Sequence, residues 1–201
     1  MYLNTLSITA EHVLGVLLNN LEVSYSIREL SREVKQDYKI VFTTVKTLAK
    51  EKLVMITRVS NINQCRLHLS QEYSSLFGFI SERFARQKVS TPIWNALQDI
   101  ISSLSNPFYT LLLFGSHAKN TARKTSDIDL LFIISELRQE KEIVASVHKS
   151  ALLNNIKINP VILTQKEFIK GLQEKSISQE AYKKHVLIKG GELFYTILSH
   201  A

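Results

Sequence analysis

The stretch FYTLLLFGSHAKNTARKTSDIDLLFII, residues 108 to 134, contains two apolar runs that each meet polar residues. The first run ends at Gly115 and Ser116, and a short apolar run bounded by turn residues is typical of a buried strand. Ten residues then separate Ser116 from Asp127, and the second apolar run follows at once. The stretch therefore predicts a buried strand, a Gly-Ser turn, a polar loop and a second buried strand.

The Gly-Ser turn has the properties of a phosphate-binding turn. Ala118 and the polar residues after it predict a short helix beginning just beyond the turn. Backbone N–H groups and the Ser116 hydroxyl would then point toward the end of the strand, where anions bind. Gly115 has no Cβ, so a triphosphate can approach the backbone closely.

Asp127 and Asp129 open the second predicted strand, with Ile128 between them. Because side chains alternate along a strand, the two carboxylates are expected on one side and Ile128 on the other. Magnesium commonly takes one or two carboxylates together with phosphate oxygens and water. The pair therefore predicts a site for Mg²⁺ or Mn²⁺ beside the Gly-Ser turn.

A Gly-Ser pair that ends one strand, followed by Asp-x-Asp at the start of the next, resembles the signature of the DNA polymerase β nucleotidyltransferase superfamily. The local pattern GSHAKN with SDIDLL is similar to the minimal nucleotidyltransferases of bacteria and archaea, over residues 107 to about 195. The resemblance implies a mixed β-sheet flanked by helices. It also implies metal-dependent transfer of a nucleoside monophosphate from an NTP, with ATP as first candidate, to a protein or nucleic-acid acceptor. By the same resemblance, Asp127 and Asp129 are the catalytic and metal-binding residues, while Gly115 and Ser116 hold the outgoing phosphates.

Two positions depart from the family pattern. Members often carry arginine where this chain has Lys119, so Lys119 takes the cationic phosphate-binding role. Its single ammonium group binds phosphate less specifically than the two-pronged guanidinium of arginine. The superfamily usually places a third carboxylate on a later strand, but the corresponding segment, IKINPVILT at residues 156 to 164, has no acid. Asn159 stands at the equivalent position, and its amide oxygen can bind a cation but cannot accept a proton. Glu142 and Glu167 are alternative candidates.

The missing carboxylate leaves two functions open. The first is the nucleotidyltransferase described above. The second is a transcription regulator or antitoxin-like protein that keeps the fold and binds nucleotide, or a toxin-like protein partner, with little or no turnover. Asn159, whose amide cannot accept a proton, favours the second function.

The first seventy residues predict three helices and a strand pair. The first helix begins where Thr9 can act as a cap, the second runs from Ile27 to about Val34 with Ser26 and Glu29 as a capping box, and the third begins at Tyr38. Strands are expected at residues 53 to 59 and 65 to 69, joined by the polar residues 60 to 64. This order resembles a winged helix-turn-helix module.

Such a module lays its third helix in the major groove of DNA. The candidate contact residues on that helix are polar or basic: Lys39, Thr43, Lys46 and Lys50. A three-helix domain of this kind can instead mediate a homodimer, and the two roles are compatible.

The remaining segments complete an α+β prediction in three parts: a winged helix at residues 1 to 70, a helical connector at 71 to 106 and a nucleotidyltransferase domain at 107 to 201. A basic helical tail is expected from about Ile169 to His185, with a solvated end at residues 182 to 185. A closing hairpin is expected at residues 186 to 195, and Pro160 indicates an edge strand.

Composition sets broad limits on the protein class. The chain has 201 residues and a formal net charge of +7, which favours a polyanionic partner such as nucleic acid or nucleotide. Its one cysteine, Cys65, excludes an internal disulfide and a cysteine zinc site, as expected in a reducing cytoplasm. No run of about 18 apolar residues is present, so a cytoplasmic protein with no membrane partner is predicted.

Overall fold

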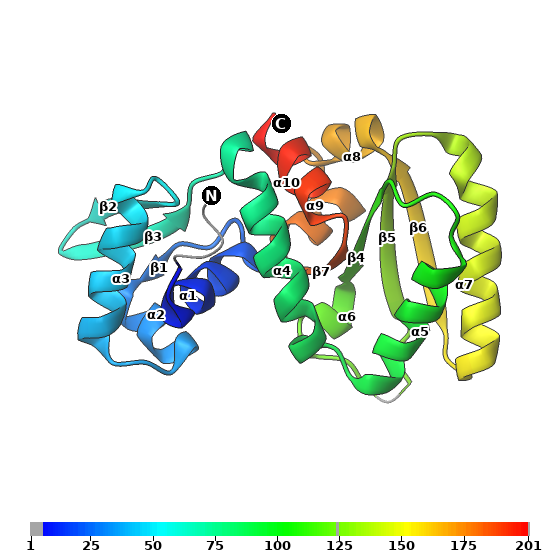
Figure 1. Cartoon of the computed structure of the whole chain (residues 1–201), viewed down its shortest axis with the longest axis horizontal. Coiled ribbons are helices and arrows are strands. Elements are labelled where there is room, and N and C mark those ends of the chain that lie inside the picture. The colour runs from blue at the N-terminus through cyan, green and yellow to red at the C-terminus, as the bar shows by residue number, and fades with distance from the viewer. Residues whose placement is uncertain (1–5, 124, 201) are drawn as a thin grey trace.

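The computed structural model describes residues 6–123 and 125–200, which form a mixed α+β fold with two sheets (Figure 1). The first sheet lies in the N-terminal part, and its three strands have the order β1-β3-β2. The elements of this part are α1 (Ile8–Leu18), β1 (Tyr25–Ser26), α2 (Ile27–Val34), α3 (Tyr38–Lys50), β2 (Val54–Val59) and β3 (Ile62–Leu67).

The second helix follows the sequence prediction closely. Ser26 Oγ accepts the backbone N–H of Glu29, and the Glu29 carboxylate accepts the N–H of Ser26, so the capping box is confirmed. Lys35 then adopts a left-handed conformation that ends α2, and Asp37 caps α3. The turn between the two helices is therefore built by local side-chain and backbone chemistry.

Three details of the N-terminal prediction were wrong. Ser7, not Thr9, caps α1 by accepting the backbone N–H of Ala10. β3 begins at Ile62, because residues 62 to 64 pair with residues 57 to 59 of β2 across a turn at Ser60 and Asn61. The two-residue strand β1, which pairs with β3, was not predicted.

The second sheet has four strands in the order β6-β5-β4-β7. β5 pairs with β6 in parallel and with β4 antiparallel, so the sheet is mixed. Pro160 lies in the edge strand β6, as predicted. The strands and the short elements next to them are β4 (Tyr109–Phe114), α6 (Gly115–Ala118), β5 (Ile128–Ile134), η2 (Leu137–Gln139), β6 (Ile158–Thr164) and β7 (Val186–Lys189).

Helices cover both faces of this sheet (Figure 1). On one face, α5 and α7 pack on alternate strand residues that include Leu111, Leu130 and Phe132. On the other face, Leu112, Leu131 and Ile133 share a core with α4, α8, α9 and α10, and that core continues into the N-terminal part. The helices are η1 (Gln71–Tyr73), α4 (Ser74–Lys88), α5 (Thr91–Ser103), α7 (Glu140–Asn154), α8 (Gln165–Gly171), α9 (Ile177–Lys183) and α10 (Gly191–Ser199).

The predicted closing hairpin was wrong in its second half. β7 forms, but the chain turns at Gly190 with φ 78° and continues as the helix α10. The buried residues Phe194, Tyr195, Ile197 and Leu198 follow helical spacing and fill the core against α4. At their closest approach, a Cβ added to Gly78 would collide with the backbone of Gly191, so this helix pair requires glycine.

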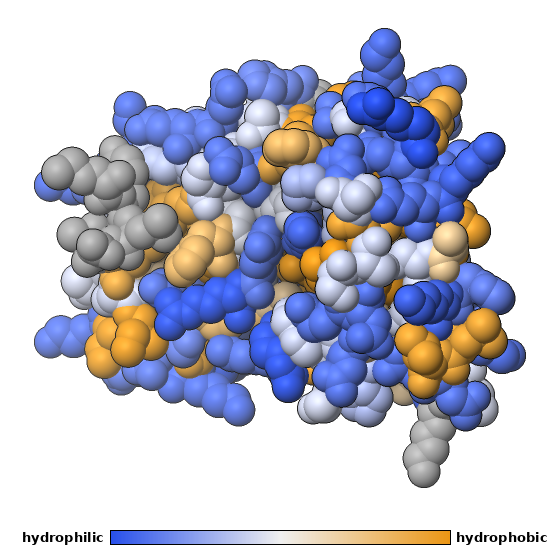
Figure 2. Space-filling model, turned by 45° about the vertical axis from the view of Figure 1, so that its right-hand side comes forward, coloured by the Kyte–Doolittle hydropathy of each residue, from blue (hydrophilic) through white to orange (hydrophobic). Residues whose placement is uncertain are grey.

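Exposed large apolar side chains are spread over several elements of the surface. On the face shown in Figure 2, hydrophilic residues predominate and the apolar ones form separate patches. Val144, Leu152 and Leu153 on α7 are among the exposed apolar residues. Within residues 6–123 and 125–200, no helix has the length and apolar character needed to cross a membrane.

Candidate functional site

Asp127, Asp129 and Asn159 lie together at one end of the second sheet. Asp127 immediately precedes β5, and Asp129 is paired in register with Asn159 of β6. Asn159 Nδ2 lies 3.3 Å from Asp127 Oδ2 and 3.4 Å from Asp129 Oδ1, so one amide bridges both carboxylates. Ile128 points to the opposite face and is 3% exposed. The two carboxylates therefore occupy one side of the strand, as alternation requires.

The Gly-Ser turn packs directly against this pair. Gly115 has φ +68°, and a Cβ added there would overlap Asp129 Oδ2. A side chain at this position would both strain the backbone and displace the carboxylate. Glycine is thus required at position 115 because the turn and the Asp129 carboxylate occupy adjoining space.

The short helix after the turn begins earlier than the sequence predicted. α6 is a single turn that starts at Gly115, because Lys119 N donates to the Gly115 carbonyl and Thr121 N to the Ser116 carbonyl. His117 Nε2 lies 3.4 Å from the Ser126 carbonyl, and Ser126 Oγ accepts the N–H of Arg123. These contacts tie the loop before Asp127 back onto the turn.

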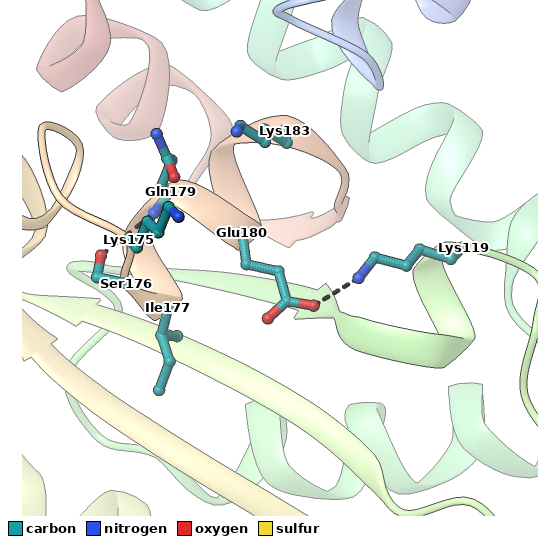
Figure 3. Close-up of a pocket in the computed structure, with 7 residues that line it drawn as sticks. All are labelled: Lys119, Lys175, Ser176, Ile177, Gln179, Glu180 and Lys183. Atoms are coloured by element: carbon teal, nitrogen blue, oxygen red, sulfur yellow. Dashed lines mark hydrogen bonds and ion pairs between the residues drawn. The ribbon is translucent and has the colours of Figure 1, made fainter.

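Lys119 lies at the end of α6 and forms an ion pair with Glu180 of α9. The Lys119 Nζ to Glu180 Oε1 distance is 2.6 Å, and the two side chains are 46% and 42% exposed. Both residues line an open pocket of about 550 Å³ together with Lys175, Ile177 and Lys183 (Figure 3). Asp127 and Asp129 are not among the residues that line it. Sequence reasoning missed Glu180 because 61 residues separate it from Lys119.

The two alternative acids have structural partners elsewhere. Glu142 accepts the backbone N–H of Ser105, and this hydrogen bond lowers the pKa of its carboxyl group. Glu167 accepts the N–H and the hydroxyl of Thr164 in a capping box, which lowers its pKa in the same way. In the described part of the chain, no group of three or more His, Cys, Asp and Glu side chains is arranged to hold a metal ion. Neither glutamate supplies the third carboxylate.

The side chains present fit a hard divalent cation. The donors are two half-buried carboxylates and the amide of Asn159, and oxygen ligands of this kind suit Mg²⁺ and Mn²⁺. The Asn159 amide now donates to both carboxylates, and a half-turn about its last side-chain torsion presents Oδ1 to the same place. Glycine at position 115 leaves room for the Asp129 carboxylate, which a Cβ there would overlap.

A comparison with protein families finds a match over the part of the chain that contains this arrangement. Residues 95–188 match the family model described as a nucleotidyltransferase domain. This part of the chain has the nucleotidyltransferase fold. The match begins within α5 and ends within β7, so it contains the Gly-Ser turn, the Asp pair and Asn159.

The other comparisons add little to the nucleotidyltransferase assignment. No curated protein matches the chain. Among solved structures, one described as "Structure of TrmBL2, an archaeal chromatin protein, shows a novel mode of DNA binding" is similar at 14% identity, with 88% of this chain and 72% of that chain covered. Its TM-score of 0.31 does not establish a common fold.

Outside the nucleotidyltransferase domain, the four residues predicted to contact DNA share one face of α3. Lys39, Thr43, Lys46 and Lys50 are all exposed, and their spacing places them on a single stripe. Val41, Val45 and Leu48 are buried on the opposite side. The Lys46 ammonium lies 4.6 Å from the centre of the Phe42 ring. The structure therefore places a basic stripe on the surface of α3.

Proposed function

We propose that the nucleotidyltransferase domain transfers a nucleoside monophosphate from an NTP, with ATP as first candidate, to a hydroxyl group of a protein or nucleic-acid acceptor. The observation that carries the proposal is the approach of Gly115 to an Asp pair bridged by Asn159. This juxtaposition joins a phosphate-binding turn to a set of oxygen ligands for a cation.

Each residue has a defined task in this proposal. Asp127 and Asp129 hold Mg²⁺ or Mn²⁺, and Asn159 contributes its amide oxygen. The bound cation neutralises phosphate charge and orients the in-line displacement. The backbone of Gly115 and the hydroxyl of Ser116 contact the outgoing phosphates. Lys119 breaks its ion pair with Glu180 and places its ammonium group beside the same phosphates.

The transfer forms a bond between the acceptor oxygen and the α-phosphorus and breaks the bond from the α-phosphorus to the bridging oxygen, releasing pyrophosphate. The acceptor proton must also leave. Asn159 cannot accept it, because a neutral amide is not a base at neutral pH. The proton therefore passes to solvent or to a group on the acceptor, and slow transfer is expected.

A second candidate function is nucleotide binding without turnover, as in a regulator that retains the fold. The presence of Asn159 opposite the Asp pair favours it, together with the lack of a third acidic ligand in the described residues. Incubation with magnesium and ATP labelled at the α-phosphate separates the two candidates. Magnesium-dependent transfer of label to a protein or nucleic acid supports the enzyme, and binding with no transfer to either supports the regulator.

Glu180 is expected to restrain Lys119. Replacing it (Glu180→Gln) leaves Lys119 available for phosphate, so magnesium–ATP should bind about two- to tenfold more tightly in a calorimetric titration. Because the ion pair is exposed, the free energy of unfolding should change by less than about 1 kcal/mol. Glu174→Gln, which removes an exposed acid nearby, is the matched control. Equal or weaker binding in Glu180→Gln would show that Lys119 does not serve the nucleotide.

We further propose that residues 1 to 70 form a winged helix that binds duplex DNA, joined through residues 71 to 106 to the nucleotidyltransferase domain at 107 to 201. The order of helices and strands, the hairpin formed by β2 and β3, and the basic stripe on α3 support this. In such a module, lysines neutralise phosphates and the third helix faces the major groove.

Removal of one lysine from the stripe gives a measurable effect on DNA binding. Lys46→Ala is expected to weaken duplex binding and to reduce the slope of log affinity against log salt concentration by about 1, because one phosphate contact is lost. Fluorescence anisotropy at several salt concentrations measures both quantities. Lys141→Ala on α7 removes the same charge from an exposed site in the other half of the chain and should leave binding unchanged. Salt-insensitive binding would contradict the winged-helix proposal.

A further inference from the structure

β2 is an edge strand of the first sheet, and its outer side is open. The order β1-β3-β2 leaves one side of Val54–Val59 without a neighbouring strand. Within residues 6–123 and 125–200, the elements with extensive contacts to β2 are β3 and α3. The hairpin of β2 and β3 lies at the end of the molecule far from the second sheet (Figure 1). β2 therefore presents an edge that another strand can reach.

The hydrogen-bond pattern shows which residues of β2 face the open edge. Val59 pairs with Ile62 directly across the hairpin turn. Farther along, the Leu53 carbonyl accepts the N–H of His68. Because bonding alternates along an antiparallel pair, odd-numbered residues of β2 bond to β3, and even-numbered residues direct their N–H and C=O groups to the open edge. The outward residues are Val54, Ile56 and Arg58.

β2 lacks the features that protect the other edge strands of the two sheets. β6 contains Pro160, β7 packs against α4, and β1 has two residues. β2 has six residues, contains no proline, and pairs with β3 without a register shift. Its one charged residue is Arg58. A long, regular and weakly charged edge is a template for strand pairing.

Apolar side chains are exposed on both faces of the hairpin beside this edge. Met55 and Val59 are 48% and 55% exposed on one face, together with Ile62, the cross-strand partner of Val59, at 52%. Ile56 on the other face is 36% exposed. A strand added to the edge would remove part of this apolar surface from water, which favours association.

Two copies of β2 are complementary to each other in one antiparallel register. A two-fold axis beside Ile56 pairs this residue with Ile56 of the partner subunit and pairs Val54 with the partner subunit's Arg58. Every outward residue then faces an outward residue of the other copy, and each such pair exchanges two backbone hydrogen bonds. Arg58 does not face the partner's Arg58, so like charges are not opposed. Other registers leave outward residues unpaired.

We propose that β2 pairs with β2 of a second copy of this chain in the register centred on Ile56, which joins the two three-stranded sheets into one continuous sheet. A pairing of six residues is small beside the roughly 1,600 Å² of a standard interface, so dissociation in the micromolar range is expected. The inference depends neither on nucleotidyl transfer nor on DNA binding.

Sedimentation equilibrium of the full chain tests the association at concentrations from about 1 μM to about 1 mM, over which the average mass should rise from one copy to two. Met55→Lys/Val59→Lys adds charge beside the edge without changing the β2–β3 ladder and should raise the dissociation constant about tenfold or more. Leu152→Lys/Leu153→Lys makes the same kind of change on the exposed surface of α7 and should leave the association unchanged.

A second variant blocks the backbone of the edge. Ile56→Pro removes an outward N–H that the ladder with β3 does not use, so the hairpin should remain and the association should be lost. Far-UV circular dichroism shows whether each variant is folded. A mass of one copy at every concentration of the unmodified chain, or association that persists in folded forms of both β2 variants, would overturn the proposal.

Disulfide trapping tests the register. Met55 lies opposite Thr57 of the partner subunit, at the Cα–Cα distance of about 4.5 Å of a non-hydrogen-bonded pair, which a disulfide can span. An equimolar mixture of Met55→Cys and Thr57→Cys should therefore form a cross-linked dimer in a glutathione buffer. Either variant alone should form far less, because like positions are diagonal neighbours about 7–8 Å apart.

The native cysteine does not interfere with this experiment. Cys65 is buried, and burial raises the pKa of its thiol to about 11, so it stays protonated and unreactive. Cross-linking in the mixture that exceeds cross-linking in either variant alone supports the register centred on Ile56. Equal cross-linking in the single variants, or none in the mixture, would contradict that register and with it the proposal.

Discussion

Nucleotidyl transfer is expected to fall by about 10³-fold or more in Asp129→Asn, because a metal ligand contributes several kcal/mol to charge neutralisation. The substitution keeps the shape of the side chain beside Gly115 and removes only its negative charge. Asp129 also accepts from Asn159, so the change removes one of the two carboxylates that the amide bridges. Initial rates with labelled ATP at saturating magnesium measure the effect.

The control for this substitution is Asp99→Asn on α5. Asp99 accepts a hydrogen bond from Asn154 on the surface and lies outside the site, so the same chemical change there should leave the rate within about twofold. A rate in Asp129→Asn close to that of the unmodified protein would remove Asp129 from the metal-binding set.

Adding a carboxylate on the neighbouring strand β6 is expected to accelerate transfer. Asn159→Asp places a third carboxylate in register with Asp129, where it can bind the cation and accept the acceptor's proton. A positioned proton acceptor supplies roughly 10² to 10⁴ in rate, so an increase of that order is expected if the proton step limits the reaction. Single-turnover measurements separate this step from product release.

The same substitution should make the site depend more strongly on the metal. Three carboxylates on the neighbouring strands β5 and β6 repel one another, so Asn159→Asp should unfold at a lower temperature in a chelator and recover with magnesium. Asn159→Ala serves as the control, because it removes the bridging amide without adding charge. An unchanged rate and an unchanged response to magnesium in Asn159→Asp would show that Asn159 does not stand at the third ligand position.

Most residues of the proposed site could be predicted from sequence because they are close together along the chain. Gly115 directly follows β4, and Asp129 lies in β5, the next strand along the chain. Strand alternation alone predicts that the side chains of Asp127 and Asp129 share a face. Asn159 was found through the family pattern, since the sequence gives no measure of which strand pairs with β5. The α2 capping box was equally predictable, because all its atoms lie within four residues.

Contacts between segments far apart in the chain could not be predicted from sequence in the same way. The ion pair of Lys119 with Glu180 depends on α9 folding over β4, and no local pattern encodes it. The end of the α9 segment was predicted to be solvated, yet His185 is buried beneath α10. The apolar residues at 193 to 195 are compatible with a strand or a helix in so short a segment, and packing against α4 decides for the helix.

The central claim is that Asp127 and Asp129 hold a divalent cation together with nucleotide phosphate beside Gly115. Electron paramagnetic resonance of Mn²⁺ with and without ATP tests it directly, since Mn²⁺ takes the same oxygen ligands as magnesium. The account predicts that bound Mn²⁺ appears with ATP in the unmodified protein and is lost in Asp127→Ala/Asp129→Ala. Equal Mn²⁺ binding in both proteins would contradict it.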